Sequence, residues 1–145
     1  MEEIIVLVIL LAVGYFAGVY FEKQHYQSIR AREKATLHLP MINFGAKQPL
    51  PPASDAALFA GTVVISSDYF KTFLLALRNL VGGRVLAYES LLDRGRREAL
   101  LRMKEEAIAW GATQILNVRF ETSTIGNGQQ GIISIEVIAY GTGIR

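Results

Sequence analysis

An uninterrupted apolar stretch opens the chain and differs in pattern from everything that follows. Residues 4–21 read IIVLVILLAVGYFAGVYF and contain no charged side chain. At about 1.5 Å per residue a helix of that length spans roughly 27 Å, close to the hydrocarbon thickness of a bilayer. The pattern therefore predicts a transmembrane anchor over residues 1–21. Aromatic residues gather at its C-terminal end, as they do at membrane interfaces: Tyr15, Phe16, Tyr20 and Phe21.

A cleavable signal peptide is the main competing interpretation of this stretch, and a buried core helix is another. A signal peptide has a basic region before its apolar core, whereas Glu2 and Glu3 precede this one. Basic residues follow it instead, so the positive-inside rule predicts an outside N-terminus and a cytoplasmic C-terminal domain. We therefore expect a single-pass protein of the inner (cytoplasmic) membrane. The basic residues are Lys23, Arg30, Arg32 and Lys34.

Gly14 and Gly18 lie four residues apart within the apolar stretch and form a GxxxG pair. Small residues at this spacing allow two membrane helices to approach closely. Glycine is also frequent by chance in apolar segments, so a fortuitous pair is the alternative. We treat Gly14 and Gly18 as a candidate helix–helix contact.

Residues 22–60 form a predicted linker with two halves of different character. The first half, residues 22–36, is polar and helix-compatible, so it should continue the anchor helix into water. The second half holds all four prolines of the chain, and proline disfavours regular structure. Its many apolar residues indicate that it lies along the domain or an adjacent copy. The two histidines, His25 and His38, could form a metal site or simply be exposed to solvent.

Alternating segments predict a folded domain over residues 61–145. A β-branched run at 62–65 predicts a strand. Apolar residues at helical spacing then predict one helix over 69–81 and a longer one over 87–110. Gly111 marks the end of the second helix.

Two strands should close the chain, over residues 114–125 and 132–142, because apolar and polar residues alternate in both. The loop 126–131 between them reads GNGQQG and so spells GxGxxG. A dinucleotide site needs a helix after this motif, whereas a strand follows here, so we expect a hairpin loop and no cofactor. The order β-α-α-β-β predicts a small α+β domain with an antiparallel C-terminal hairpin and two helices on one face of the sheet.

The polar face of this sheet is the candidate site. It should lie opposite the helices, and it could be a subunit interface, a ligand face or a solvated surface. We favour the interface, because a domain of this size buries little core and small domains are often stabilised by oligomerisation. The candidate residues are Asn117, Arg119, Glu121, Ser134, Glu136 and Tyr140.

The composition of the chain excludes several classes of function. The formal net charge is only +2, and no segment has the concentrated basic patch expected of a nucleic-acid-binding protein. Cysteine is absent, which excludes disulfides, thiolate metal sites and cysteine nucleophiles. No nucleophile–base spacing is recognisable on the polar face, so we expect no catalytic residues, no cofactor and no enzymatic activity. Whether a metal binds is left open.

Several short motifs in residues 61–145 together resemble the YbjQ family. The resemblance implies a compact α+β fold that assembles into a homo-oligomeric ring, expected to be a pentamer, with no established activity. The family is labelled heavy-metal-binding, but the matching region has no histidine, so its ligands would be carboxylates and Met103. Family members often have a glycine where this chain has Asn117. The motifs are Leu80-Val81-Gly82-Gly83-Arg84, Tyr88-Glu89, Arg97, Ala99, Met103, Ala107, Gly111-Ala112 and Gly141-Thr142-Gly143.

These expectations combine into two candidate functions. The first is a membrane-anchored, ring-forming scaffold or interaction module whose partners are copies of itself and the lipid bilayer. The alternative is a small-ligand or metal-binding protein whose sites form between subunits. Such sites would be lined by Arg119, Glu121 and Glu136.

Overall fold

The computed structural model describes residues 2–66, 86–125 and 134–145. The chain divides into two compact units, Met1–Lys34 and Ala35–Arg145. The first unit belongs to one helix, and the second contains the β-sheet.

Helix α1 runs without interruption from Glu2 to Ala35. The predicted helical continuation of the apolar stretch into polar residues is thus present. Acidic residues occupy its first turn and basic residues its last, which is the arrangement that the helix dipole favours. Beyond the last turn, the His38 side chain donates from Nδ1 to the carbonyl oxygen of Ala35 at 2.9 Å. His38 therefore satisfies a carbonyl at the helix end.

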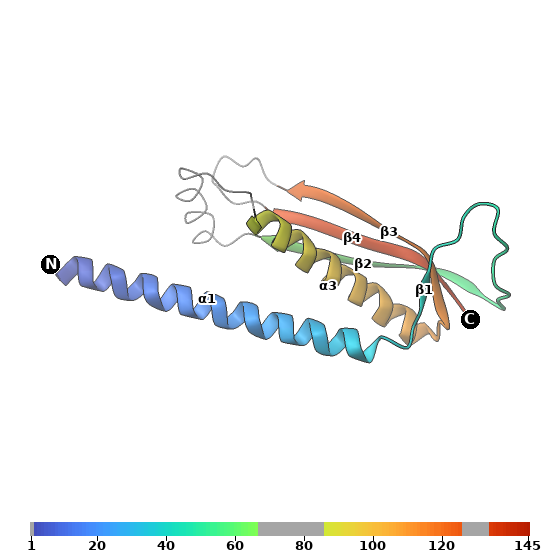
Figure 1. Ribbon diagram of the computed structural model, residues 1–145, viewed down its shortest axis with the longest axis horizontal. Coiled ribbons are helices and arrows are strands. Elements are labelled where there is room, and N and C mark those ends of the chain that lie inside the picture. Colours follow the sequence, from blue (N-terminus) through green and yellow to red (C-terminus); the bar gives the residue numbers. More distant parts are fainter. Residues whose placement is uncertain (1, 67–85, 126–133) are drawn as a thin grey trace. The chain divides into compact units, whose positions relative to one another are not determined.

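Four strands form one mixed sheet in the order β1-β3-β4-β2 (Figure 1). The two-residue strand β1 pairs in parallel with β3, while β4 lies between β3 and β2 and is antiparallel to both. The α+β class is confirmed, although the sequence predicted only three strands. The strands are β1 (Met41–Ile42), β2 (Ala56–Ser66), β3 (Gln114–Ile125) and β4 (Ser134–Ile144).

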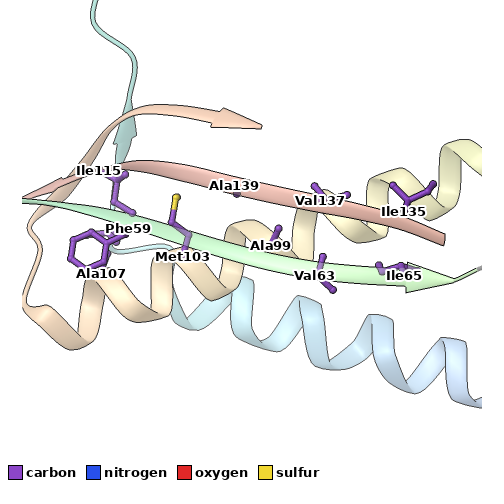
Figure 2. Close-up of a cluster of buried hydrophobic side chains, with 11 residues drawn as sticks. Phe59, Val63, Ile65, Ala99, Met103, Ala107, Ile115, Ile135, Val137 and Ala139 are labelled. Carbon is purple, nitrogen blue, oxygen red and sulfur yellow. The ribbon is translucent and has the colours of Figure 1, made fainter. Parts of the chain in front are cut away.

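Helix α3 (Leu86–Trp110) packs on one face of the sheet, mainly against β2 and β4. Its buried side chains meet those of the strands in a single apolar core (Figure 2). The backbones of α3 and β2 approach closely at Gly61, where an added Cβ would come within 2.6 Å of the Met103 nitrogen. The core comprises Leu39, Phe59, Val63, Ile65, Ala99, Met103, Ala107, Ile115, Ile135, Val137 and Ala139.

Several element boundaries differ from those predicted. Strand β2 starts at Ala56, inside the predicted linker 22–60, so the sheet begins before the expected domain start at residue 61. Strand β4 runs to Ile144 and not to residue 142. The predicted helix over 69–81 and the loop 126–131 lie outside the described residues.

A β-bulge interrupts β3 between Leu116 and Arg119, where two residues lie opposite Gly141 of β4. Asn117 occupies the bulge with a φ of 53°, a left-handed conformation that asparagine tolerates better than most residues. The extra residue reverses the alternation of faces along the strand. The alternation of apolar and polar residues over 114–125 predicts one face for Leu116, Val118 and Phe120, and the bulge shows that this is wrong, because Leu116 lies on the opposite face.

Arg145, the residue after β4, contacts both the residue before β2 and the end of α3. Its guanidinium group bonds the Asp55 carboxylate and the Trp110 carbonyl oxygen at 3.0 and 2.9 Å. The same group lies 4.0 Å from the centre of the Trp110 ring. Trp110 also packs against Phe59, with ring centroids 5.5 Å apart.

Candidate functional site on the outer face of the sheet

Residues of each strand alternate between two faces of the sheet, and only one of these faces meets α3. In β4, Ile135, Val137 and Ala139 are buried toward the helix. The residues between them point to the opposite side, which we name the outer face. Residues directly opposite each other on neighbouring strands share a face. The register therefore shows which residues of β2 and β3 lie on the outer face. The outer face comprises Ala56, Leu58, Ala60, Thr62, Val64 and Ser66 of β2, Arg119, Glu121, Ser123 and Ile125 of β3, and Ser134, Glu136, Ile138, Tyr140 and Thr142 of β4.

The structure brings five of the six predicted site residues onto this outer face. Arg119 lies directly opposite Tyr140, and Glu121 lies opposite Ile138. Glu136 lies opposite Ser123 on β3 and Val64 on β2. At the far end Ser134 lies beside Ser66, and their hydroxyl oxygens are 2.7 Å apart.

Asn117 does not belong to this group, because the bulge removes it from the alternation. Its Oδ1 accepts a hydrogen bond from the backbone N–H of Phe44 at 2.7 Å. Asn117 thereby fixes the segment after β1 against β3, and its left-handed φ explains why glycine would also suit this position. Its role in this fold is structural, and the prediction that it projects from the candidate face is wrong.

Apolar residues make up much of the outer face, and the sequence analysis did not assign them to it. Leu58, Val64 and Ile125 are 71%, 56% and 45% exposed, and they share this face with the half-buried Ile138. Exposed apolar side chains that gather on one face are typical of interaction surfaces. The alternation of exposed and buried residues along β2 assigns Leu58 and Val64 to this face. The sequence could not assign Leu58, because the strand predicted from it started after residue 61.

Three charged side chains share the outer face: Arg119, Glu121 and Glu136. Glu121 and Glu136 are diagonal neighbours across β3 and β4, within reach of each other in such a ladder. None of the three has an ion pair or hydrogen bond with another described residue. These charges are therefore available to a partner or a ligand.

The described residues of a single copy do not fit a heavy-metal site. Within residues 2–66, 86–125 and 134–145, no group of three histidines or carboxylates could hold an ion. The protein has no cysteine at all, and soft metals prefer thiolate ligands. The Nδ1 of His38 donates to the Ala35 carbonyl oxygen at the end of α1.

The second predicted contact lies on α1. Gly14 and Gly18 are one helical turn apart and so share a face of the helix. A Cβ added at Gly14 would meet nothing within 4 Å. This part of the helix therefore leaves space for another backbone to approach.

Comparison with known proteins shows which family this chain resembles. The family model YbjQ_1, described as "Putative heavy-metal-binding", matches residues 54–145. A UPF0145 protein of Clostridium novyi is 38% identical over 89 residues, which cover 61% of this chain and 82% of the relative. A UPF0145 protein of Natronomonas pharaonis is 46% identical over 70 residues, covering 48% and 62% respectively.

Among solved structures, a protein of unknown function of the DUF74 family from Pediococcus pentosaceus is similar. It is 12% identical, with a TM-score of 0.43, over 73% of this chain and 95% of the other. The family match includes all of β2 and every later element, and α1 precedes it.

Proposed function

The chain belongs to the YbjQ_1 family, and we propose that it is a membrane-anchored, ring-forming interaction module without catalysis of its own. The observation that carries the proposal is the apolar part of α1. An 18-residue window of this helix has a mean hydropathy of 2.6, and none of it is buried. A helix with this long an apolar stretch needs an apolar environment, and a bilayer supplies one.

The length of α1 supports anchoring with a rigid extension. At about 1.5 Å per residue, the apolar residues 4–21 match the bilayer core, and the polar residues 22–35 continue for roughly 20 Å beyond it. The basic side of the helix, with Arg32 and Lys34 in its last turn, belongs in the cytoplasm by the positive-inside rule. We therefore place the sheet domain in the cytoplasm, under the inner membrane.

The outer face supports self-association. It combines exposed apolar residues with the charges of Arg119, Glu121 and Glu136, which pair with no described residue, as expected of a surface that a partner covers. A second copy of the chain is the partner that needs no further component. A ring of such copies, which we expect to be a pentamer, would gather several α1 helices at one place. Gly14 and Gly18 would then lie within helix–helix contacts.

The alternative function is binding of a small ligand or a hard cation between subunits. The neighbouring carboxylates of Glu121 and Glu136 favour this possibility, since carboxylates suit hard cations. Two carboxylates make an incomplete site, and a second copy could supply the missing ligands. Native mass spectrometry of the oligomer with added Mn²⁺ tests it: binding that disappears in the Glu121→Gln variant supports this function, and no bound ion argues against it.

Membrane fractionation of the full-length protein tests the anchoring. We expect the protein to stay in the membrane pellet after alkaline carbonate washing and to dissolve only in detergent. The absence of cysteine allows topology to be read from single variants. In the Glu3→Cys variant a membrane-impermeant maleimide should react from outside, whereas in Lys47→Cys it should react only after permeabilisation. Recovery of the protein in the soluble fraction would refute the anchor.

A further inference from the structure

We propose that the open edge of β3, residues 119–125, pairs in parallel with the free edge of β2 in a second copy of this chain. The inference rests on the proposed ring and names the contact that builds it. It follows from the direction of backbone groups along the two outermost long strands, β2 and β3.

The outward groups of β2 are fixed by its pairing with β4. Asp55 and Arg145 exchange both backbone hydrogen bonds, at 3.1 and 3.2 Å. Such pairs alternate along an antiparallel ladder with pairs whose N–H and C=O groups point away from each other. The even-numbered residues of β2 therefore direct their backbone groups to the free edge. Consistently, the carbonyl oxygen of Thr62 accepts a hydrogen bond from Arg102 of α3 at 2.8 Å, a bond that the neighbouring strand would replace in the proposed pair.

The same alternation, carried across β4, fixes the outward groups of β3. Before the bulge the odd-numbered residues point outward, and the Ile115 N–H donates to the Pro40 carbonyl at 2.9 Å. The bulge shifts the pattern by one residue. Beyond it, Phe120, Thr122 and Thr124 direct their N–H and C=O groups away from β4.

These outward groups have no partner in the described part of the chain. Strand β1 covers β3 only at Ile115 and Leu116, and Asn117 holds Phe44 next to it. From Arg119 to Ile125 every side chain is exposed, including Phe120 at 40%. Monomeric proteins usually protect such an edge with charged residues, proline, a bulge or a covering segment. Beyond the bulge, residues 119–125 contain Arg119 and Glu121 but neither lysine nor proline, and both charged residues belong to the outer face.

A second copy's β2 fits this edge better than a second β3 does. Pairing of two β3 edges would give a two-fold dimer and leave both β2 edges open. Pairing of β3 with β2 is head-to-tail, so the β3 edge and the β2 edge of each copy both find a partner strand. A closed ring results if the rotation from one copy to the next adds up to a full turn. Because β2 and β3 are both antiparallel to β4, a rotation about the ring axis makes the new pair parallel.

Charge favours a β3–β2 pair over a β3–β3 pair. Glu121 of β3 is exposed on the outer face and has no partner among the described residues. The residues of β2 on that face are all uncharged. Joining β3 to β2 therefore places Glu121 beside uncharged residues, whereas joining two β3 edges brings two copies of Glu121 together.

Disulfide cross-linking of the full-length protein in membranes tests the pairing, on a background without cysteine. In a joined sheet Ser123 of β3 lies on the same face as Ala60, Thr62 and Val64 of the neighbour's β2. Adjacent strands are about 4.8 Å apart, within reach of a disulfide. Ser123→Cys combined with a cysteine at one of these three positions should give a ladder of linked chains under mild oxidation. Each single variant should remain unlinked.

Distinct outcomes separate the failure of this contact from the failure of the ring. A covalent dimer from Ser123→Cys alone would replace the proposed contact with a β3–β3 pair. An oligomeric protein in which none of the three double variants cross-links would refute the edge contact and leave the proposed ring standing. A monomeric protein would overturn both.

Two proline variants provide a matched control. Thr122→Pro removes an N–H that points to the open edge, so β3 should keep its bonds to β4 while neighbours can no longer pair. Ser123→Pro removes an N–H that points to β4 and should destabilise the domain itself. We expect Thr122→Pro to give a folded monomer, with the fluorescence of Trp110 unchanged. A Thr122→Pro protein that retains the wild-type oligomer mass would overturn the proposal.

Discussion

Replacement of Gly61 by alanine should separate α3 from β2. The new Cβ would collide with the carbonyl oxygen of Ala99 and lie 2.6 Å from the Met103 nitrogen. Both atoms belong to the helix backbone and cannot rotate away as a side chain could. Since ordinary contacts begin near 3.4 Å, the Met103 nitrogen alone requires the helix to withdraw by about 0.8 Å, and the Ala99 oxygen requires more.

The cost can be worked from the side chains that pack at this point. Burial of Phe59, Val63 and Met103 contributes about 1.5–3 kcal/mol each, and a gap of 0.5–1 Å forfeits roughly a quarter to a half of the contact energy. The loss is about 1–4 kcal/mol, in line with the usual effect of overpacking. Alanine also restricts the unfolded chain and returns about 0.4–1 kcal/mol. We therefore expect a net destabilisation of about 1–3 kcal/mol.

Urea unfolding of the full-length protein in detergent measures this loss. Trp110, the single tryptophan, reports on it because its ring packs against Phe59. Gly45→Ala is the matched control, since its added Cβ would meet only the Gln48 side chain, at 3.7 Å. All variants are compared at one protein concentration, because the proposed oligomerisation would make stability concentration-dependent. If Gly61→Ala were as stable as Gly45→Ala, the close approach of α3 and β2 would be wrong.

Three further predictions concern the bulge, the C-terminal residue and the anchor. Asn117→Gly should change stability by less than about 1 kcal/mol, whereas Asn117→Val should cost about 2 kcal/mol in urea unfolding, because valine disfavours the left-handed φ. Arg145→Ala should cost about 1 kcal/mol, and a double-mutant cycle with Asp55→Ala should assign less than about 1 kcal/mol to their exposed ion pair. Gly14→Leu should weaken α1 self-association in bilayers by about 1 kcal/mol, measured by energy transfer between labelled helices. A wild-type value for Asn117→Val, Arg145→Ala or Gly14→Leu would contradict the respective interpretation.

Elements with a strong periodic pattern were predictable from the sequence. Strand β3 has its expected bounds, and α3 ends at Trp110, as the following glycine indicates. In β3 and α3 the pattern of apolar residues and the turn-forming residues at the ends indicate the same boundaries, so these boundaries can be predicted from the sequence. The helical character of α1 was readable for the same reason.

Features set by tertiary pairing were not predictable. The start of β2 is rich in alanine, which has low β-propensity, and it forms a strand because it pairs with the end of β4. The bulge at Asn117 depends on the register of two strands. Strand β1 exists only because Met41 and Ile42 pair with Ile115 and Leu116 of β3. None of these leaves a periodic signal in its own segment.

The candidate site was readable in part. Alternation alone placed Arg119, Glu121, Glu136 and their neighbours on one face, since period-two patterns define faces without knowledge of pairing. The apolar half of that face and the open edge of β3 could not be predicted. Both depend on which strands are neighbours, and the sequence did not reveal that β2 pairs with β4.

The mass of the intact assembly tests the central claim most directly. The full-length protein would be extracted from membranes with detergent and examined by native mass spectrometry, which strips the micelle and weighs the complex. A membrane-anchored ring predicts one dominant species at five times the chain mass of 16.0 kDa, obtained only after the membrane is dissolved. A species of 16.0 kDa at every protein concentration, or one recovered without detergent, would contradict the account.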